Sequence, residues 1–536
     1  MWGNYKKEIE NHGRVDENWL ILGIDLGTTH SVVSYFNVGS KRPEPIDISQ
    51  GFGKIPMPSV VQYREENGFK EWVIGEEAYR SMTLYPKTTI ASIKRKMGYL
   101  EATQLGEASY LPEEISAMIL KELIHHVTTM NPKGVIAGVV VSVPYDFDDA
   151  AKKATMKACQ LAGLAEGLIC LIEEPKAAAL AYNFRHELKQ SEKVMVFDFG
   201  GGTLDITIFE VKEMSSERIH LQVLSEGGEA FHGGDNVDEI LLGHFYDLLQ
   251  KETGLHKEQI SIENQTELLQ RAREIKERLS GVKKIKVPFT FCIPPFMKEM
   301  TREQLEEQIH PFVQKTRQLV LKTLSQAYSG AIGPSDIDLV LLEGGSSSSP
   351  WVKEMLISVF NDYEKISTSE RPALDISIGA TYYAAIKMGL LTHPDLVALG
   401  QSIQFEGSVP HDIGFEVDFG AKKEFHTMIA RGTPYLLAKK TQVFTLSAES
   451  QKETTSLHLK ILERIHKEDK IHQCKLIGEV NLTGLPERPM GQTKLKVTIL
   501  AEEEGGLIRG MVEDLGSMFK ASFTPNRNEV TVLHAR

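Results

Sequence analysis

Two short segments of the sequence repeat one chemical pattern, in which an apolar run leads through an aspartate into a turn of glycine and threonine. Residues 21–33 read ILGIDLGTTHSVV, residues 194–206 read VMVFDFGGGTLDI, and the two align on Asp25 and Asp198. A glycine turn exposes backbone N–H groups and admits a ligand that a side chain would keep away. With hydroxyl groups beside those amides, such a turn forms a cradle for an anion, and phosphate fits it well.

The two aspartates suit a divalent cation at the same place. Mg²⁺ usually keeps several waters and meets only one or two carboxylates while it bridges phosphate oxygens. The repeat therefore predicts two β-hairpins that hold a nucleoside polyphosphate and its metal between two lobes. Either turn alone could be purely structural, but two of them, each with its aspartate, favour the phosphate site. The Walker A pattern GxxxxGK[ST] is absent from the sequence, which excludes a P-loop.

Two further glycine clusters follow apolar runs and precede helical patterns. They read GGEAFHGGDNVD at residues 227–238 and EGGSSSSP at residues 343–350. Turns of this kind bring helix N-termini and free amides to a ligand, although they are also common in folds without a ligand. A zinc site is not indicated, because His125 and His126 are adjacent and cannot share a metal as an i, i+4 pair does.

The elements that must position these turns alternate along the chain. From Leu20 to about Leu391, apolar strand-like runs alternate with amphipathic helical patterns, which is typical of an α/β protein. We expect strands at residues 20–25, 134–144, 168–175, 194–200 and 337–345, and helices at residues 113–127 and 235–250. After Leu391 short alternating segments predominate, and we expect strands there at residues 457–462, 493–500 and 529–534. Several short strands separated by turn signals predict a β-sandwich.

The expected organisation has four parts. We assign a polar tail to residues 1–19, the α/β domain to residues 20–391, a linker to residues 392–409 and the β-sandwich domain to residues 410–536. The linker carries enough apolar residues to pack against another part of the protein.

Composition limits the classes of function. The chain has 536 residues, of which 73 are acidic and 60 are basic, and its net charge is −13. An acidic chain offers no positive field to attract polyanions, so we expect it to bind neither nucleic acid nor membranes. The four cysteines lie too far apart for a metal-ligating pair, which indicates reduced thiols. The polar N-terminus has no apolar signal segment, so we expect a cytoplasmic protein.

The motifs together resemble those of a known family. Residues 23–31, GIDLGTTHS, are similar to the first phosphate loop of the heat-shock-70 (DnaK-like) chaperones. Five other segments resemble motifs of that family in its order: IKRKMG at 93–98, VSVPYDFDDAAKKAT at 141–155, EEPKAAALAY at 173–182, FDFGGGTLDI at 197–206 and LLEGGSSSSP at 341–350. The resemblance is close from residue 20 to about residue 390 and weaker in the C-terminal part.

The resemblance implies an actin-like (ribonuclease H-like) ATPase domain of two lobes, with ATP or ADP and Mg²⁺ in the cleft, followed by a small β-sandwich. It assigns Lys94 to the γ-phosphate, and Glu174, Asp198 and Thr203 to the attacking water and the metal shell. It assigns the metal to Asp25, Asp198 and Asp205. The residues implied in nucleotide binding are Gly27, Thr28, Thr29, Gly200, Gly201, Gly202, Thr203, Gly233, Gly234, Lys276, Ser280, Gly344, Gly345 and Ser346.

Three departures from the family pattern fall on the adenine side. Arg273 stands where the family has a glutamate, Ser348 and Ser349 replace an Arg-Ile pair that packs on the base, and Ala373 replaces an aspartate. Loss of a stacked arginine removes roughly 1 kcal/mol or more of base contact. We therefore expect weaker ATP binding than in a standard member of the family, with the phosphate chemistry intact.

The resemblance also implies partners. A member of this family binds unfolded or extended polypeptide segments and works with a J-type co-chaperone and a nucleotide-exchange factor. In the β-domain, His426 is expected to arch over a bound peptide and Thr455 to line the central pocket. The sequence ends at Arg536, directly after the last expected strand, so we expect no helical lid. Two other hypotheses remain: a nucleotide-dependent adaptor with one dedicated protein partner, and a metabolite kinase on the same fold.

Overall fold

A computed structural model gives the structure of the chain, and the description covers most of its length. The described residues are 18–48, 55–66, 69–184, 191–214, 218–327, 330–369, 371–391, 402–406, 409–418, 423–445, 456–465, 468–483, 485–486, 492–501, 508–517, 520–523 and 531–533. The predicted tail and most of the predicted linker lie outside these residues, and so does Thr455.

The chain forms two compact units, which are described separately. The first unit contains Met1–Asp146 and Ala154–Gln404, and the second contains Phe147–Lys153 and Phe405–Arg536. The limits of the predicted tail, linker and domains remain predictions.

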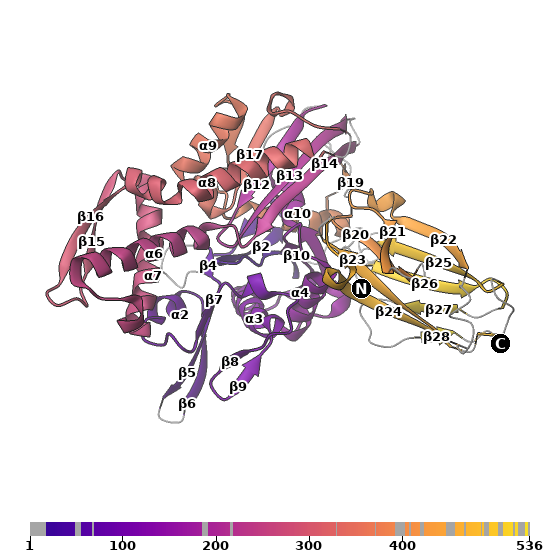
Figure 1. Ribbon diagram of the computed structural model, residues 1–536, viewed down its shortest axis with the longest axis horizontal. Coiled ribbons are helices and arrows are strands. Elements are labelled where there is room, and N and C mark those ends of the chain that lie inside the picture. The colour runs from indigo at the N-terminus through magenta and orange to yellow at the C-terminus, as the bar shows by residue number, and fades with distance from the viewer. Residues whose placement is uncertain are drawn as a thin grey trace. The chain divides into compact units, whose positions relative to one another are not determined.

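Two sheets with the same strand order form the centre of the first unit (Figure 1). The first sheet has the order β11 (Ile169–Glu173), β10 (Val135–Val143), β1 (Trp19–Asp25), β2 (His30–Asn37) and β3 (Arg42–Pro45). The second has the order β18 (Ile366–Thr368), β17 (Leu339–Glu343), β12 (Lys193–Phe199), β13 (Thr203–Met214) and β14 (Arg218–Ala230), with β19 (Ser402–Glu406) beside β14. In each sheet the first three strands are parallel and the next two antiparallel. The predicted repeat is therefore a duplication of whole sheets.

The expected strands and helices of this unit are confirmed, with one correction. The helices expected at 113–127 and 235–250 are α3 (Pro112–Met130) and α6 (Gly234–Thr253). The strand expected at 168–175 ends at Glu173, and Glu174 begins the helix α5 (Glu174–Asn183). The reason is Pro175, because proline lacks an N–H and its fixed φ favours the first turn of a helix.

Helix α10 (Asp375–Met388) covers the first sheet, although it comes from the end of the unit. It packs against α5, β1, β10 and β2. The contact is close, because a Cβ atom added to Gly23 of β1 would lie 2.2 Å from the backbone nitrogen of Thr381. The hydroxyls of Ser34 and Ser377 also form a buried hydrogen bond of 2.8 Å.

Helices also enclose the second sheet. Helix α8 (Arg302–Ser325) lies along β13 and β14, and α6 packs against α7 (Ile262–Gly281) (Figure 1). Their apolar faces form one core with Phe197 and Phe199 of β12.

The remaining elements of the unit are β4 (Met57–Pro58), β5 (Val60–Glu66), β6 (Phe69–Ile74), α2 (Glu76–Ser81), β7 (Thr89–Ala91), the short 3₁₀ helix η1 (Ile93–Lys96), β8 (Thr103–Leu105), β9 (Ala108–Tyr110), β15 (Lys284–Phe289), β16 (Phe296–Thr301) and α9 (Pro350–Phe360). Helix α4 (Asp149–Leu161) begins in residues assigned to the second unit.

The second unit is a β-sandwich, as the sequence predicts. One sheet has the order β21 (Lys423–Ile429), β20 (Asp412–Asp418), β23 (Ser456–Arg464) and β24 (Lys475–Thr483). The other has the order β22 (Lys439–Thr445), β25 (Lys494–Ala501), β26 (Ile508–Asp514), β27 (Lys520–Phe523) and β28 (Thr531–Leu533). Alternate residues of both sheets form a shared apolar core. His426 of β21 lies beside the rings of Phe415 and Phe444, with centroids 5.5 and 5.2 Å away.

In the described part of the chain, every helix is too short or too polar to span a lipid bilayer.

Candidate functional site

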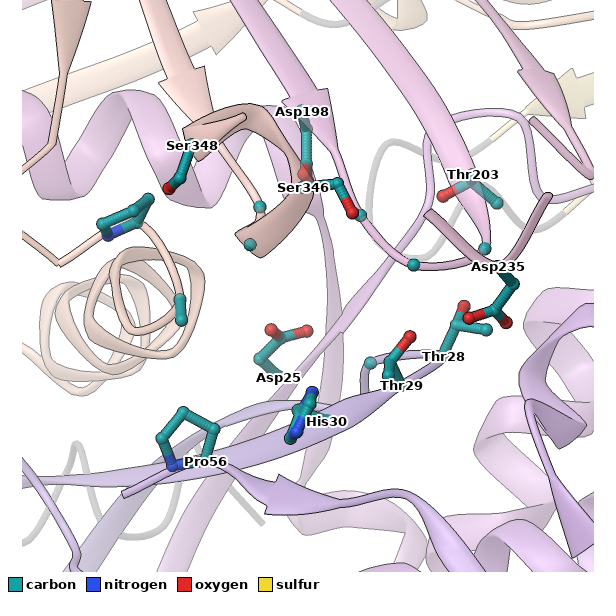
Figure 2. Close-up of a pocket in the computed structure, with 18 of the residues that line it drawn as sticks. Asp25, Thr28, Thr29, His30, Pro56, Asp198, Thr203, Asp235, Ser346 and Ser348 are labelled. Atoms are coloured by element: carbon teal, nitrogen blue, oxygen red, sulfur yellow. The ribbon is translucent and has the colours of Figure 1, made fainter. Parts of the chain in front are cut away.

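A cavity of about 510 Å³ in the first unit brings together residues of both sheets (Figure 2). Its volume lies within the range of roughly 300–1,000 Å³ that is usual for ligand pockets. Most residues implied by the sequence line it, namely Asp25, Gly27, Thr28, Thr29, Lys94, Glu174, Asp198, Gly200, Gly201, Gly202, Thr203, Lys276, Ser280, Gly344, Gly345 and Ser346. The carboxyl ends of parallel strands are the usual place for a ligand in open α/β sheets.

The two glycine turns face each other and nearly touch. A Cβ atom added to Gly201 would lie 1.6 Å from Oγ1 of Thr29, and one added to Gly202 would lie 2.5 Å from Oγ1 of Thr28. Neither distance is possible for a real side chain, so both positions need glycine. The buried Oγ1 of Thr29 has no hydrogen-bond partner among the described residues. The predicted opposition of the two hairpins is thus a feature of the structure, and one hydroxyl there is left for a ligand.

Gly233 and Gly234 lie behind the second turn, outside the lining of the cavity. A Cβ atom on Gly233 would lie 2.4 Å from the carbonyl oxygen of Gly201. The first amides of α6 serve the turn itself, because the N–H of Gly234 donates to the carbonyl of Gly200 (3.0 Å) and that of Asp235 to the carbonyl of Gly201 (2.8 Å). These residues therefore fix the shape of the second turn.

One lysine and several carboxyl groups meet at the floor of the cavity. Lys94 is buried on η1, and its Nζ lies 2.5 Å from Oε1 of Glu174, the first residue of α5. Asp25, at the end of β1, accepts a hydrogen bond of 2.9 Å from the hydroxyl of Ser142 on β10. Asp198 is the second-last residue of β12, and Asp205 lies directly opposite it on β13. The register of the hairpin thus places Asp205 beside Asp198 on the neighbouring strand, although Asp205 is not among the residues that line the cavity.

This cluster has more carboxyl groups than cations. Burial raises the pKa of Asp25 to about 6, with a further contribution from the nearby charge of Glu174. Burial, together with Glu174 and Asp25, raises the pKa of Asp198 well above its usual value. For Lys94, burial alone would lower the pKa, but the negative charges of Glu174 and Asp25 outweigh it and raise the pKa.

Asp205 shows the same shortage of positive charge. Burial raises its pKa well above the usual value, and Asp146 and Glu174 add to the effect. Neither of its carboxylate oxygens has a partner with regular hydrogen-bond geometry in the described part of the chain, and the nearby hydroxyl of Thr203 offsets the rise in pKa only in part. No three His, Cys, Asp or Glu side chains of the described residues form a metal-binding group by themselves. The donor set thus fits a Mg²⁺ ion that keeps waters and shares phosphate oxygens, since such an ion needs few protein ligands.

The opposite end of the cavity is polar and carries the departures from the family pattern. Ser280, Ser346, Ser348 and Ser349 line it, together with Pro372 and Ala373. Arg273 also lines it, but its guanidinium is engaged by the protein: Nη2 lies 3.0 Å from Asp235 and Nε lies 3.1 Å from Asp238. Lys276 pairs with Asp238 at 2.7 Å.

The lining contains residues that the sequence did not indicate. They are His30, Pro56, Asp235, Glu277 and Ile376. A signal was available for His30, which directly follows the first turn, and for Asp235, which follows the glycine pair that opens α6. Pro56, Glu277 and Ile376 carry no local signal, because their position depends on how distant elements pack.

Comparison with known proteins identifies the family. The sequence model described as "Hsp70 protein" matches residues 21–104 and 99–509. A protein named chaperone protein DnaK from Thermotoga petrophila is 32% identical over 511 residues, which covers 93% of this chain and 78% of the relative. The chaperone protein DnaK of Thermosipho melanesiensis is 30% identical over 509 residues, with the same shares of 93% and 78%.

These matches extend over both units, and they agree with the duplicated sheets, the opposed glycine turns and the β-sandwich. The chain therefore belongs to the heat-shock-70 family of chaperones, and its fold is the two-lobed actin-like ATPase fold followed by a small β-sandwich.

Proposed function

We propose that this chain binds Mg-ATP between its two glycine turns, hydrolyses it, and couples the state of the nucleotide to the binding of an extended polypeptide segment. The observation that carries the proposal is the pair of opposed turns above one buried lysine and several carboxyl groups. Backbone amides and threonine hydroxyls suit the phosphates, and the carboxyl groups suit a divalent cation.

Each group of residues in the cavity has its own role in phosphoryl transfer. Lys94 supplies positive charge where negative charge accumulates on the γ-phosphate, and its ion pair with Glu174 fixes its position. Glu174, Asp198 and Thr203 orient the attacking water, and Thr28 and Thr29 hold the phosphates. Asp25, Asp198 and Asp205 would hold Mg²⁺, directly or through its waters. When bound, the ion neutralises phosphate charge, which is a main requirement of this reaction.

The base end of the site supports a second part of the proposal, namely weaker nucleotide affinity than in a standard member of the family. Ser348 and Ser349 offer no flat cation for stacking, and the guanidinium of Arg273 is held by Asp235 and Asp238. Calorimetric titration with ATP tests this directly, and a submicromolar dissociation constant would contradict it.

Steady-state ATPase measurements test the main proposal. We expect Lys94→Ala and Thr203→Val to lose most of the turnover of the wild type, and chelation of Mg²⁺ to abolish it. Lys96→Ala is a matched control, because Lys96 is an exposed lysine on the same short helix. Equal turnover in the wild type, Lys94→Ala and Thr203→Val would refute the assignment of the site.

The same assay with added unfolded protein separates the chaperone from the alternative adaptor. Stimulated turnover supports a chaperone that binds extended segments. For such a chaperone we expect a J-type co-chaperone and an exchange factor as partners, and a cytoplasmic location. Nucleotide binding without any effect of unfolded protein, together with one stable partner in pull-down experiments, supports a nucleotide-dependent adaptor. The aromatic group of Phe415, His426 and Phe444 in the β-domain favours the first outcome, since the partly exposed rings of His426 and Phe444, which lie beside the buried ring of Phe415, offer apolar surface to a peptide.

A further inference from the structure

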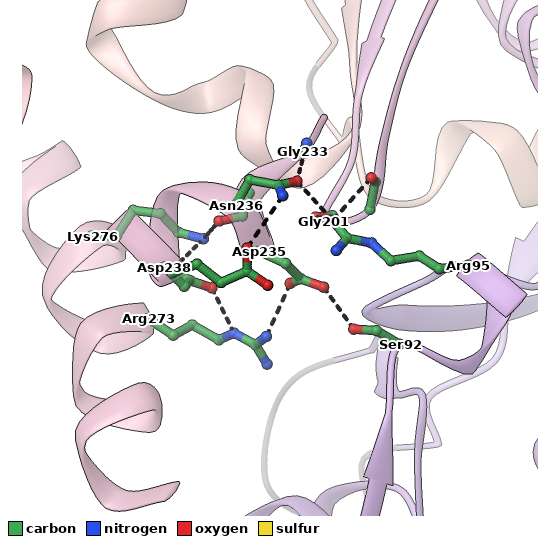
Figure 3. A network of polar contacts seen from close by, with 12 residues as sticks. Ser92, Arg95, Gly201, Gly233, Asp235, Asn236, Asp238, Arg273 and Lys276 are labelled. Carbon is green, nitrogen blue, oxygen red and sulfur yellow. Dashed lines mark hydrogen bonds and ion pairs between the residues drawn. The ribbon is translucent and has the colours of Figure 1, made fainter. Parts of the chain in front are cut away.

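Three residues from distant parts of the chain form a polar bridge at the side of the cavity (Figure 3). Asp235, near the start of α6, accepts a hydrogen bond of 2.6 Å from the hydroxyl of Ser92, which directly precedes η1. The other oxygen of Asp235 accepts a hydrogen bond of 3.0 Å from Nη2 of Arg273 on α7. We call Ser92, Asp235 and Arg273 the clasp. It connects the part of the first unit that carries Lys94 with the part that carries the second glycine turn.

Ser92, which makes this contact, has an unfavourable backbone conformation. Its φ is 56° and its ψ is 29°, in the left-handed region that residues with a Cβ atom rarely adopt. Such a conformation is strained and persists only when the surrounding contacts impose it. The hydrogen bond to Asp235 is a contact of this kind, because it fixes the direction of the serine side chain.

Arg273 is placed to hold the acidic side of the clasp. Its guanidinium reaches both Asp235 and the fully buried Asp238, and Lys276 supplies the second cation that Asp238 requires. A planar guanidinium can donate to two carboxylates at once, which an ammonium on a flexible chain does less well. The arginine that stands in place of the family's glutamate therefore binds to the protein itself.

A second set of contacts runs parallel to the clasp. Nη2 of Arg95, also on η1, donates to the carbonyl of Gly202 (3.0 Å) and to Oδ1 of Asn236 (2.9 Å). Ser92 and Arg95 flank Lys94, so the contacts of both tie the helix that carries Lys94 to the second turn and to α6.

We propose that Arg273 is a positioning residue, which acts through Asp235 and Ser92 to keep the two sides of the cavity together around a bound nucleotide. The proposal rests on nucleotide binding in this cavity. In a site whose contact with the base is weak, it assigns to the ion pairs of Arg273 the slowing of nucleotide release, and it makes η1 dependent on a residue of α7 that is far away in the sequence.

The first test is the release of a fluorescent ADP analogue, followed by stopped-flow fluorescence after mixing with excess ADP. Removing one hydrogen bond to a charged group is expected to accelerate release about tenfold in Arg273→Ala and in Ser92→Ala. The double variant is expected to release little faster than either single variant, because both substitutions disable the same bridge. Arg273→Lys is expected to fall between the wild type and Arg273→Ala, since lysine can pair with only one carboxylate well.

The controls separate the clasp from a general loss of structure. Arg278→Ala removes an exposed arginine from the same helix and is expected to leave release unchanged. Ser92→Ala leaves the ion pairs of Arg273 intact, so it reports on the clasp even where Arg273→Ala folds poorly. Release at the wild-type rate in Ser92→Ala and Arg273→Lys would overturn the proposal, and so would effects that multiply in the double variant.

The second test needs no nucleotide. Hydrogen exchange of the nucleotide-free protein, measured by mass spectrometry, is expected to show faster exchange at residues 92–97 in Arg273→Ala but not in Arg278→Ala. Unchanged exchange there would refute the clasp, whatever the ADP experiment gives. If the wild type fails to bind the ADP analogue, the proposed nucleotide site is wrong, and this exchange experiment still decides whether Arg273 holds η1.

Discussion

Removing the charge of Lys94 should destabilise the first unit far more than removing the charge of its partner Glu174. Lys94 is the ammonium that faces the carboxyl groups of Asp25, Glu174, Asp198 and Asp205, which all interact electrostatically within one buried cluster. Lys94→Met leaves these groups without that cation, whereas Glu174→Gln reduces the excess of negative charge and leaves Lys94 beside the aspartates.

The structure sets the size of the difference. Removing one partner of a buried ion pair typically costs about 3–5 kcal/mol, because the other charge remains buried and uncompensated. We expect a loss of this size in the free energy of unfolding for Lys94→Met. For Glu174→Gln we expect about 1 kcal/mol or less, since the amide oxygen can still accept a hydrogen bond from Lys94. The double variant should be more stable than Lys94→Met, because it buries one carboxylate fewer.

Urea unfolding without metal or nucleotide, followed by tryptophan fluorescence, measures these differences. The tryptophans among the described residues, Trp19, Trp72 and Trp351, all lie in the first unit, so their emission follows its unfolding. Equal losses for Lys94→Met and Glu174→Gln would refute the reasoning, and a larger loss for Glu174→Gln would reverse it.

Three further predictions concern single positions. Gly201→Ala should weaken nucleotide binding at least tenfold in a fluorescence titration, because its methyl group would displace Thr29, whereas Gly243→Ala on the exposed face of α6 should leave binding unchanged. Burial lowers the pKa of His232 to about 4 from 6.5, so the unfolded chain binds the proton more readily and stability should fall as the pH drops from about 6.5 to 4. His232→Gln should flatten this part of the melting temperature against pH, and an unchanged slope would contradict it. Gly243→Ala, in the exposed middle of α6 with open space around the added carbon, should raise stability by about 0.5–1 kcal/mol in urea unfolding.

The sequence was sufficient wherever the signal is local. Strands such as β1 and β12 are continuous apolar runs, which identify strands buried on both faces, and the repeat around Asp25 and Asp198 predicted the two hairpins. The resemblance assigned Asp205 to the metal, but its place directly opposite Asp198 is known only from the structure. The limit of β11 was missed since the effect of Pro175 on the helix start was not weighed.

The sequence was insufficient where distant elements meet. Ser92 and Asp235 are 143 residues apart, and no pattern around either residue predicts their hydrogen bond. Arg273 was recognised as a departure from the family, but its ion pairs with Asp235 and Asp238 depend on the packing of α6 against α7. Contacts of this kind depend on the tertiary structure, and the local patterns of a single sequence do not predict them.

The way α10 closes the first sheet has a consequence for synthesis on the ribosome. The strand β1 is complete once Asp25 has been made, but the helix that covers it spans Asp375–Met388. A nascent chain must therefore carry the first sheet with an open apolar face while most of the second sheet, from β12 to β18, is translated. Partly folded chains of this kind aggregate readily, so we expect the nascent chain to need protection until α10 has left the exit tunnel.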